Sequence, residues 1–131
     1  MRLVFIGDIV GKNSRDTLIN KIQDIKSQFK PEKLICNGEN AAAGYGLTKN
    51  IALSLFDSGV DAITLGNHAW DQREMLSYIE ECPQIIRAIN FPKNVPGKGF
   101  AEIRFEDGRK LLLVQVMLRL FMGMFLDDPF S

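Results

Sequence analysis

The sequence has few of the residues that build disulfide frameworks or histidine-rich sites. It contains two cysteines, Cys36 and Cys82, and a single histidine, His68, among 131 residues. Two cysteines are too few for a disulfide framework, and Cys36 lies in an apolar run where a buried thiol is the simpler interpretation. This cysteine usage predicts a reducing, cytoplasmic environment.

The chain also lacks net charge and a membrane-spanning segment. Sixteen basic and sixteen acidic residues cancel, and no Lys/Arg cluster is interleaved with aromatics, so we expect no dedicated nucleic-acid surface. The first residues meet Gly7 too early for a signal peptide. The apolar stretch over residues 111–126 is interrupted by Gln115 and Arg119 and is shorter than the ~20 residues that cross a bilayer. We therefore expect no membrane partner and interpret this stretch as a sticky edge or a homo-oligomer contact.

What is present is the composition of one globular domain. The chain is 46% hydrophobic and 24% charged, which predicts a single domain over residues 1–131. Short apolar runs at 3–6, 33–36 and 61–65 alternate with helical periodicity, the pattern of an α/β fold with parallel strands. The first run is continuously apolar, which predicts a central strand covered on both faces.

Capping and breaking residues bound the predicted helices. The three helices are predicted between Ser14 and Pro31, between Thr48 and Gly59, and between Asp71 and Pro83. Asp71 followed three residues later by Glu74 resembles a capping box. After residue 84 the pattern changes, and residues 85–86 are a candidate for another short strand.

Two further runs predict a β-hairpin. Residues 100–105 alternate partly between apolar and polar, and residues 111–114 are apolar. The Asp107-Gly108 pair between them is a turn signal. We expect this hairpin to extend the sheet.

Three loops that follow the predicted strands combine polar donors with small residues. They cover residues 7–11, 37–40 and 65–71. Each alone can be an ordinary turn in which glycine shapes the backbone, asparagine adopts left-handed angles or Asp71 caps a helix. Their spacing of about thirty residues would bring them to one edge of the sheet, because successive βα units place their loops there. The three loops together therefore favour a metal site.

The candidate ligands are mostly oxygen donors. Asp8 offers a carboxylate, Glu39 can bridge two cations with its two oxygens, and Asn67 offers a neutral amide oxygen. Such ligands suit Mg²⁺, Mn²⁺ or Fe²⁺, while imidazoles shift a site towards Fe, Mn or Zn. In a two-metal site with ions ~3.5–4 Å apart, a shared water loses a proton and attacks phosphorus.

His68 follows Asn67 and is a candidate for proton transfer. It could act as general acid when protonated, or donate a hydrogen bond to the leaving oxygen when neutral. The alternative is a loop histidine bonded to backbone. Trp70 is expected to pack the loop against the domain, or to form a wall of the substrate site.

The loop motifs carry a family resemblance. Residues 7–11 (Gly-Asp-Ile-Val-Gly), 37–42 (Asn-Gly-Glu-Asn-Ala-Ala) and 66–71 (Gly-Asn-His-Ala-Trp-Asp) resemble the calcineurin-like metallophosphoesterases, specifically their bacterial YmdB-type branch. That branch has Asn-Gly-Glu-Asn where the wider superfamily has Gly-Asp-x-x-Asp. The resemblance implies the α/β calcineurin-like metallophosphoesterase fold, here its N-terminal βαβαβ half plus a β-hairpin. It also implies an oligomeric phosphodiesterase that acts on 2′,3′-cyclic nucleotides.

The resemblance also implies roles at a dinuclear centre. Asp8 would bind one metal, Glu39 would bridge and Asn67 would bind the other. Asn40 would be a ligand or a phosphate contact, and His68 would be the catalytic histidine. The two divalent ions could be Fe, Mn, Mg or Zn.

The chain departs from the family in length and in histidine content. Family members are about twice as long, and their second half supplies three further histidines, one in a His-Gly-Glu type motif and two in a His-x-His motif. Because His68 is the sole histidine here, the chain resembles a truncated N-terminal half. Its donors are too few to hold two cations in a closed geometry, so we expect little activity from the isolated chain. The alternative function is an inactive fragment that acts as an oligomerising or interaction module.

Overall fold

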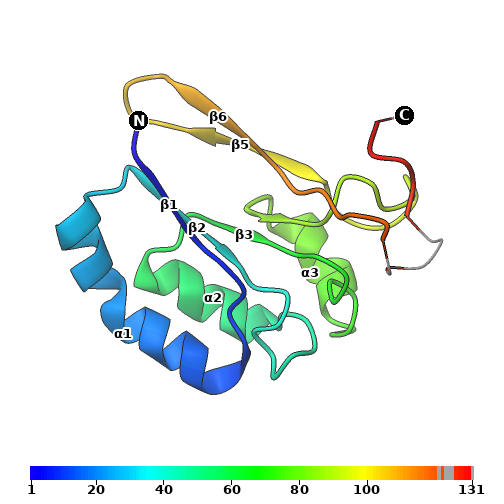
Figure 1. The fold of residues 1–131 in the computed structure, drawn as a ribbon, viewed down its shortest axis with the longest axis horizontal. Coiled ribbons are helices and arrows are strands. Elements are labelled where there is room, and N and C mark those ends of the chain that lie inside the picture. Colours follow the sequence, from blue (N-terminus) through cyan, green and yellow to red (C-terminus); the bar gives the residue numbers. More distant parts are fainter. Residues whose placement is uncertain (121, 123–125, 131) are drawn as a thin grey trace.

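The chain forms a four-stranded parallel sheet with consecutive strands side by side, in the order β1-β2-β3-β4 (Figure 1). The computed structural model describes residues 1–120, 122 and 126–130. The elements of this unit are β1 (Leu3–Ile6), α1 (Gly11–Phe29), β2 (Lys33–Asn37), α2 (Lys49–Ser58), β3 (Ala62–Thr64), α3 (Met75–Glu81) and β4 (Ile85–Ile86). The predicted α/β class is confirmed.

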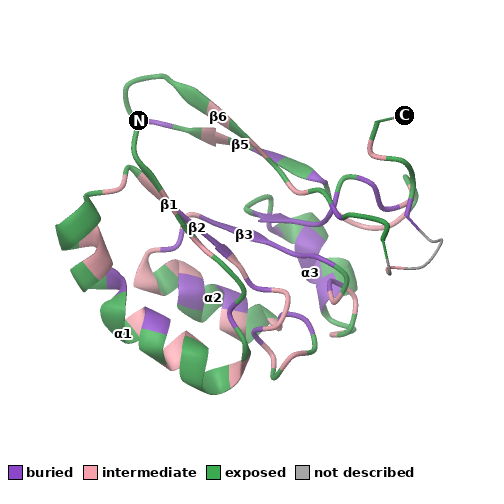
Figure 2. Cartoon of the chain, viewed as in Figure 1, coloured by how far each residue is buried: buried purple, intermediate pink, exposed green. Residues whose placement is uncertain are grey.

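The core lies between one face of the sheet and the helices. Leu34 and Ile63 of the sheet join Ile22 of α1 and Leu55 of α2 in one buried cluster. Figure 2 shows this burial along β2, β3 and the inward sides of the helices. Cys36 belongs to the same cluster, where burial raises the pKa of its thiol to about 12. The predicted buried thiol is confirmed.

Strand β1 lies at the edge of the sheet. In the described part of the chain β2 is its one neighbouring strand, and its residues alternate between exposed and half-buried. Phe5 is 56% exposed and Leu3 is 38% exposed. The prediction of a central strand covered on both faces is therefore wrong, because a continuous apolar run does not reveal whether both faces have partners.

The first helix starts earlier than predicted. α1 begins at Gly11, which adopts φ +67°. The residue before it, Val10, makes no side-chain capping hydrogen bond. Ser14 thus lies inside the first turn, and its predicted capping role is wrong. The second helix is as predicted, because Thr48 Oγ1 accepts a hydrogen bond from Ile51 N at 3.2 Å and Gly59 ends α2 in the left-handed conformation.

The predicted capping box before α3 does not form. Glu74 precedes α3 without a capping hydrogen bond from its side chain. Its Oε1 instead accepts from Lys49 N at 2.9 Å, at the start of α2. Asp71 lies further from α3 and pairs with His68, so its predicted capping role is wrong.

The hairpin forms a separate sheet. β5 (Phe100–Arg104) and β6 (Lys110–Val114) pair antiparallel, and among the described residues neither pairs with a strand of the main sheet, so the prediction that they extend that sheet is wrong. Figure 1 shows them on the side of the sheet away from α1 and α2. Their base is attached to the segment after β4, where Ile89 N donates to Gln115 O at 2.7 Å.

The apolar stretch that follows β6 is largely open to solvent. Leu118 is 79% exposed and Leu120 is 74% exposed, whereas Met117 is buried. Positions 121 and 123–125 of this predicted sticky stretch lie outside the described residues. Within the described part of the chain, no helix combines the length and the apolar character that a membrane crossing requires.

Candidate active site

The three predicted loops meet at the carboxyl edge of the sheet. Parallel pairing of β1, β2 and β3 places their ends side by side. Backbone hydrogen bonds tie the loops together: Ile9 N donates to Asn37 O at 3.2 Å, and Gly38 N donates to Thr64 O at 3.0 Å. These contacts confirm the prediction that the three loops meet at one edge of the sheet.

Asp8 and Asn40 are in direct contact. Asn40 Nδ2 donates to Asp8 Oδ1 at 2.7 Å. The backbone carbonyl of Asn40 accepts from Gly11 N at 3.0 Å and Gly44 N at 2.9 Å, which fixes the residue between two loops. Asp8 itself is exposed, so its carboxylate faces solvent from a position that Asn40 holds.

Glu39 has one satisfied oxygen and one that is buried without a partner. Asn37 Nδ2 donates to Glu39 Oε1 at 3.2 Å, and the described residues provide no hydrogen bond to Oε2. A buried carboxylate oxygen without a donor is costly and calls for a missing partner, such as a cation or an ordered water. Glu39 therefore has the electrostatic environment expected of a metal ligand.

Gly66 makes room for the Glu39 carboxylate. A Cβ at Gly66 would lie 2.6 Å from Glu39 Cδ, closer than real Cβ contacts. A larger residue would therefore displace the Glu39 carboxylate from this position, although the backbone of Gly66 is open to any residue because its φ is not positive. Sequence reasoning missed this role, and also the support that Asn37 gives Glu39. The Gly-Asn-His motif marks the position of Gly66 but does not reveal the reason for it.

Asn67 and His68 follow Gly66 on the same loop. Asn67 is exposed, and in the described part of the chain its side chain makes no hydrogen bond to Asp8, Glu39 or Asn40. His68 Nδ1 lies 2.6 Å from Asp71 Oδ2, and the edge of its ring meets Tyr45 with 6.3 Å between ring centroids. The alternative of a histidine bonded to backbone is therefore wrong, because its partner is a carboxylate.

Trp70 packs the loop against the domain, as predicted. Its ring meets Phe91 in an edge-to-face arrangement with 5.8 Å between centroids. Phe91 is buried, so this contact anchors the loop that carries His68.

The donor set can hold a cation only in part. Among the described residues, no group of three His, Cys, Asp or Glu side chains is placed to hold a metal ion. Of the candidate ligands in the loops, Asp8 and Glu39 are carboxylates, and Asn40 and Asn67 are amides. Amide oxygens are ordinary ligands of hard cations. The unpartnered Glu39 oxygen and this donor set fit a divalent ion that has further donors from elsewhere.

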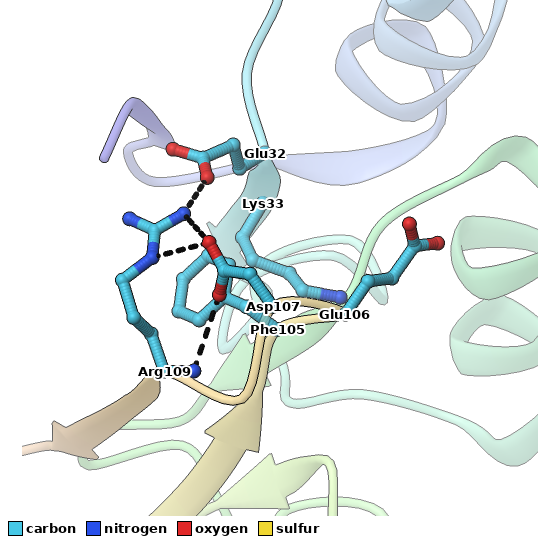
Figure 3. A pocket seen from close by; sticks show the side chains of 6 residues that line it. All are labelled: Glu32, Lys33, Phe105, Glu106, Asp107 and Arg109. Carbon is cyan, nitrogen blue, oxygen red and sulfur yellow. Dashed lines mark hydrogen bonds and ion pairs between the residues drawn. The ribbon is translucent and has the colours of Figure 1, made fainter.

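A second polar region lies at the opposite, amino end of β2. It is a hollow of about 360 Å³. Figure 3 shows the side chains that line it. The residues that line it are Glu32, Lys33, Phe105, Glu106, Asp107 and Arg109. Arg109 pairs with Glu32 and with Asp107, the latter with its Nε 2.7 Å from Oδ2, and lies 5.0 Å from the centre of the Phe105 ring.

Three of the charged residues in this hollow, Glu32, Asp107 and Arg109, satisfy one another. Hydrogen bonds from Arg109 hold the pKa values of Glu32 and Asp107 below their ordinary range, and both carboxylates raise the pKa of Arg109. These pairs join the tip of the hairpin to the start of β2. The hollow is therefore a structural ion-pair cluster without the unpartnered group seen at Glu39.

Comparison with known proteins places the chain in a family. The model of the YmdB-like protein family matches residues 4–131. The chain belongs to the YmdB-like protein family. A relative from Bacillus subtilis (strain 168) named 2′,3′-cyclic-nucleotide 2′-phosphodiesterase is 45% identical over 130 residues, which make up 99% of this chain and 48% of that protein.

Two solved structures share the fold of this YmdB-like chain. A hypothetical protein from Thermus thermophilus matches with a TM-score of 0.90 and 42% identity, over 99% of this chain and 50% of that one. A phosphatase from Mycoplasma pneumoniae matches with a TM-score of 0.83 and 27% identity, over 91% of this chain and 43% of that one. The predicted metallophosphoesterase family and fold are confirmed. The chain spans about half the length of these relatives.

Proposed function

We propose that this YmdB-like chain supplies one side of a metal-dependent phosphodiesterase centre that hydrolyses 2′,3′-cyclic nucleotides. The observation that supports this proposal most strongly is the buried, unpartnered Oε2 of Glu39 at the edge where Asp8 and Asn40 meet. The name of the Bacillus subtilis relative supports the substrate class. A cytoplasmic location and a homo-oligomer belong to the same proposal.

The roles follow from donor chemistry. Asp8, Glu39 and Asn67 would hold the divalent ions together with donors from elsewhere, and Glu39, with its two oxygens, would be shared between them. Asn40 donates its amide nitrogen to Asp8 and would offer its amide oxygen as a ligand. When bound, the two ions supply charge neutralisation and an activated water. His68 places a proton or a hydrogen bond at the ribose oxygen that leaves phosphorus. Iron, manganese, magnesium and zinc are the candidate ions.

Hydrolysis of 2′,3′-cyclic AMP in the presence of Mn²⁺ tests the proposal. Asp8→Asn and Glu39→Gln should each abolish the low turnover expected of this chain, because each removes the charge of a ligand. Asp57→Asn and Glu106→Gln are matched controls, since both positions are exposed and lie outside the three loops. Equal rates for ligand and control variants would contradict the proposal.

A second candidate function is the oligomerising module, and the exposed apolar surface favours it. Large apolar side chains are open to solvent on β1, on β6 and beyond it, namely Leu3, Phe5, Leu112, Val116, Leu118 and Leu120. Apolar surface of this kind marks an interaction site. The module predicts self-association that rises with concentration in sedimentation velocity, together with no turnover at any Mn²⁺ concentration. Turnover that disappears in Glu39→Gln would contradict it.

A further inference from the structure

We propose that Asp71 is the positioning residue for His68, holding the imidazole with its proton on Nδ1 and presenting Nε2 to the substrate. The inference rests on the proposed function of His68 and adds a residue that the function above does not use. Asp71 Oδ2 lies 2.6 Å from His68 Nδ1, a distance typical of a charge-assisted hydrogen bond. An ionised carboxylate only accepts, so the proton of this bond belongs to Nδ1.

The loop builds this pair from its own backbone. Asp71 N donates to His68 O at 3.3 Å, which closes a turn and brings the two side chains to the same side. Ala69, between them, is fully buried and anchors the turn in the core. The spacing of three residues is therefore enough to set the pair, without help from a helix.

The neighbouring loop holds the other side of the ring. Tyr45 meets the imidazole edge-to-face, and Gln72 Nε2 donates to Tyr45 O at 2.5 Å. A Cβ at Gly46 would lie 2.8 Å from His68 O, so the two loops are in close contact. The ring lies between a carboxylate and an aromatic edge, which leaves it little freedom to rotate.

Nε2 is the ring atom left open. In the described part of the chain it has no hydrogen-bond partner, and it is not among the buried atoms that lack one. About a third of each side chain of the pair is exposed, 33% for His68 and 34% for Asp71. Because the bond made by one ring nitrogen sets the state of the other, Asp71 determines what Nε2 offers to a leaving oxygen.

The tautomer of His68 tests this directly, and the test needs no bound metal. Because His68 is the sole histidine, ¹⁵N-histidine labelling yields the two ring nitrogens of one residue. At a pH well above the ordinary imidazole pKa, the wild type should show a protonated Nδ1 and an unprotonated Nε2. Asp71→Ala should move the proton towards Nε2, as in free histidine, while Asp57→Ala on α2 should leave the ¹⁵N shifts unchanged.

A wild-type ring protonated on Nε2 would overturn the inference, even if Asp71→Ala failed to fold. Unchanged ring shifts in a folded Asp71→Ala, checked by the fluorescence of Trp70, would also overturn it. Asp71→Glu keeps a carboxylate and should restore the protonated Nδ1. Mn²⁺-dependent turnover that Glu39→Gln leaves unchanged would count against the proposed phosphodiesterase and leave the tautomer result standing, so the two failures are distinguishable.

Discussion

The two polar ends of the sheet differ in whether their charges are satisfied. At the amino end of β2, Arg109 joins Glu32 and Asp107, and each charge has a partner of opposite sign. At the carboxyl end, Glu39 is held by an amide on one oxygen and is unpartnered on the other. The first arrangement stabilises the fold by itself. The second is complete only with a ligand, which is why the carboxyl end is the candidate active site.

The largest expected effect comes from closing the space beside Glu39. Gly66→Ala places a methyl group against the Glu39 carboxylate and should lower the affinity for Mn²⁺ by ~10²-fold or more, measured by isothermal titration calorimetry. Gly7→Ala is the matched control, because a Cβ there meets nothing within 4 Å. Equal Mn²⁺ affinities in the two variants would remove the role assigned to Gly66.

A second test compares the stability of the two ends without metal. In the presence of EDTA, Glu39→Gln should raise the free energy of unfolding by about 1 kcal/mol, because it removes the charge of a carboxylate whose buried Oε2 lacks a partner. Glu32→Gln should lower it, because Arg109 loses a carboxylate. Urea denaturation measures both free energies of unfolding. A change of the same sign in the two variants would contradict the difference drawn between the two ends.

The smallest effect concerns pH. The pKa values of Glu32 and Asp107 are lowered in the folded state, so their contribution to stability is present above the ordinary carboxyl pKa. It is lost as the pH falls through the lowered values. Arg109→Met should therefore weaken the acid dependence of the melting temperature, while Arg73→Met, at an exposed position, should not. Parallel curves for wild type and Arg109→Met would contradict this assignment.

Sequence reasoning predicted the elements and the meeting of the loops because both follow from local patterns. Apolar runs and caps such as Thr48 set the helices and strands, and parallel βα units bring Asp8 and Asn40 together. The exposure of Phe5 could not be predicted, because a run of four apolar residues is the same pattern whether the strand lies at the edge or in the centre of a sheet.

The finer features of the site depend on tertiary contacts. Aspartate is a residue type common at helix caps, and only the turn after β3 reveals that Asp71 faces His68. The unpartnered oxygen of Glu39 depends on how closely Gly66 approaches from the next strand. Such features are not encoded in the spacing of residues within one loop.

The central claim is that the three loops form one cation site, and paramagnetic broadening by Mn²⁺ tests it most directly. At substoichiometric Mn²⁺, the side-chain amide signals of Asn40 and Asn67 should broaden first, while those of Asn50 on α2 and the backbone signals of Asp107 and Arg109 should persist. Broadening that begins at Asp107 and Arg109, or that spares Asn40 and Asn67, would contradict the account.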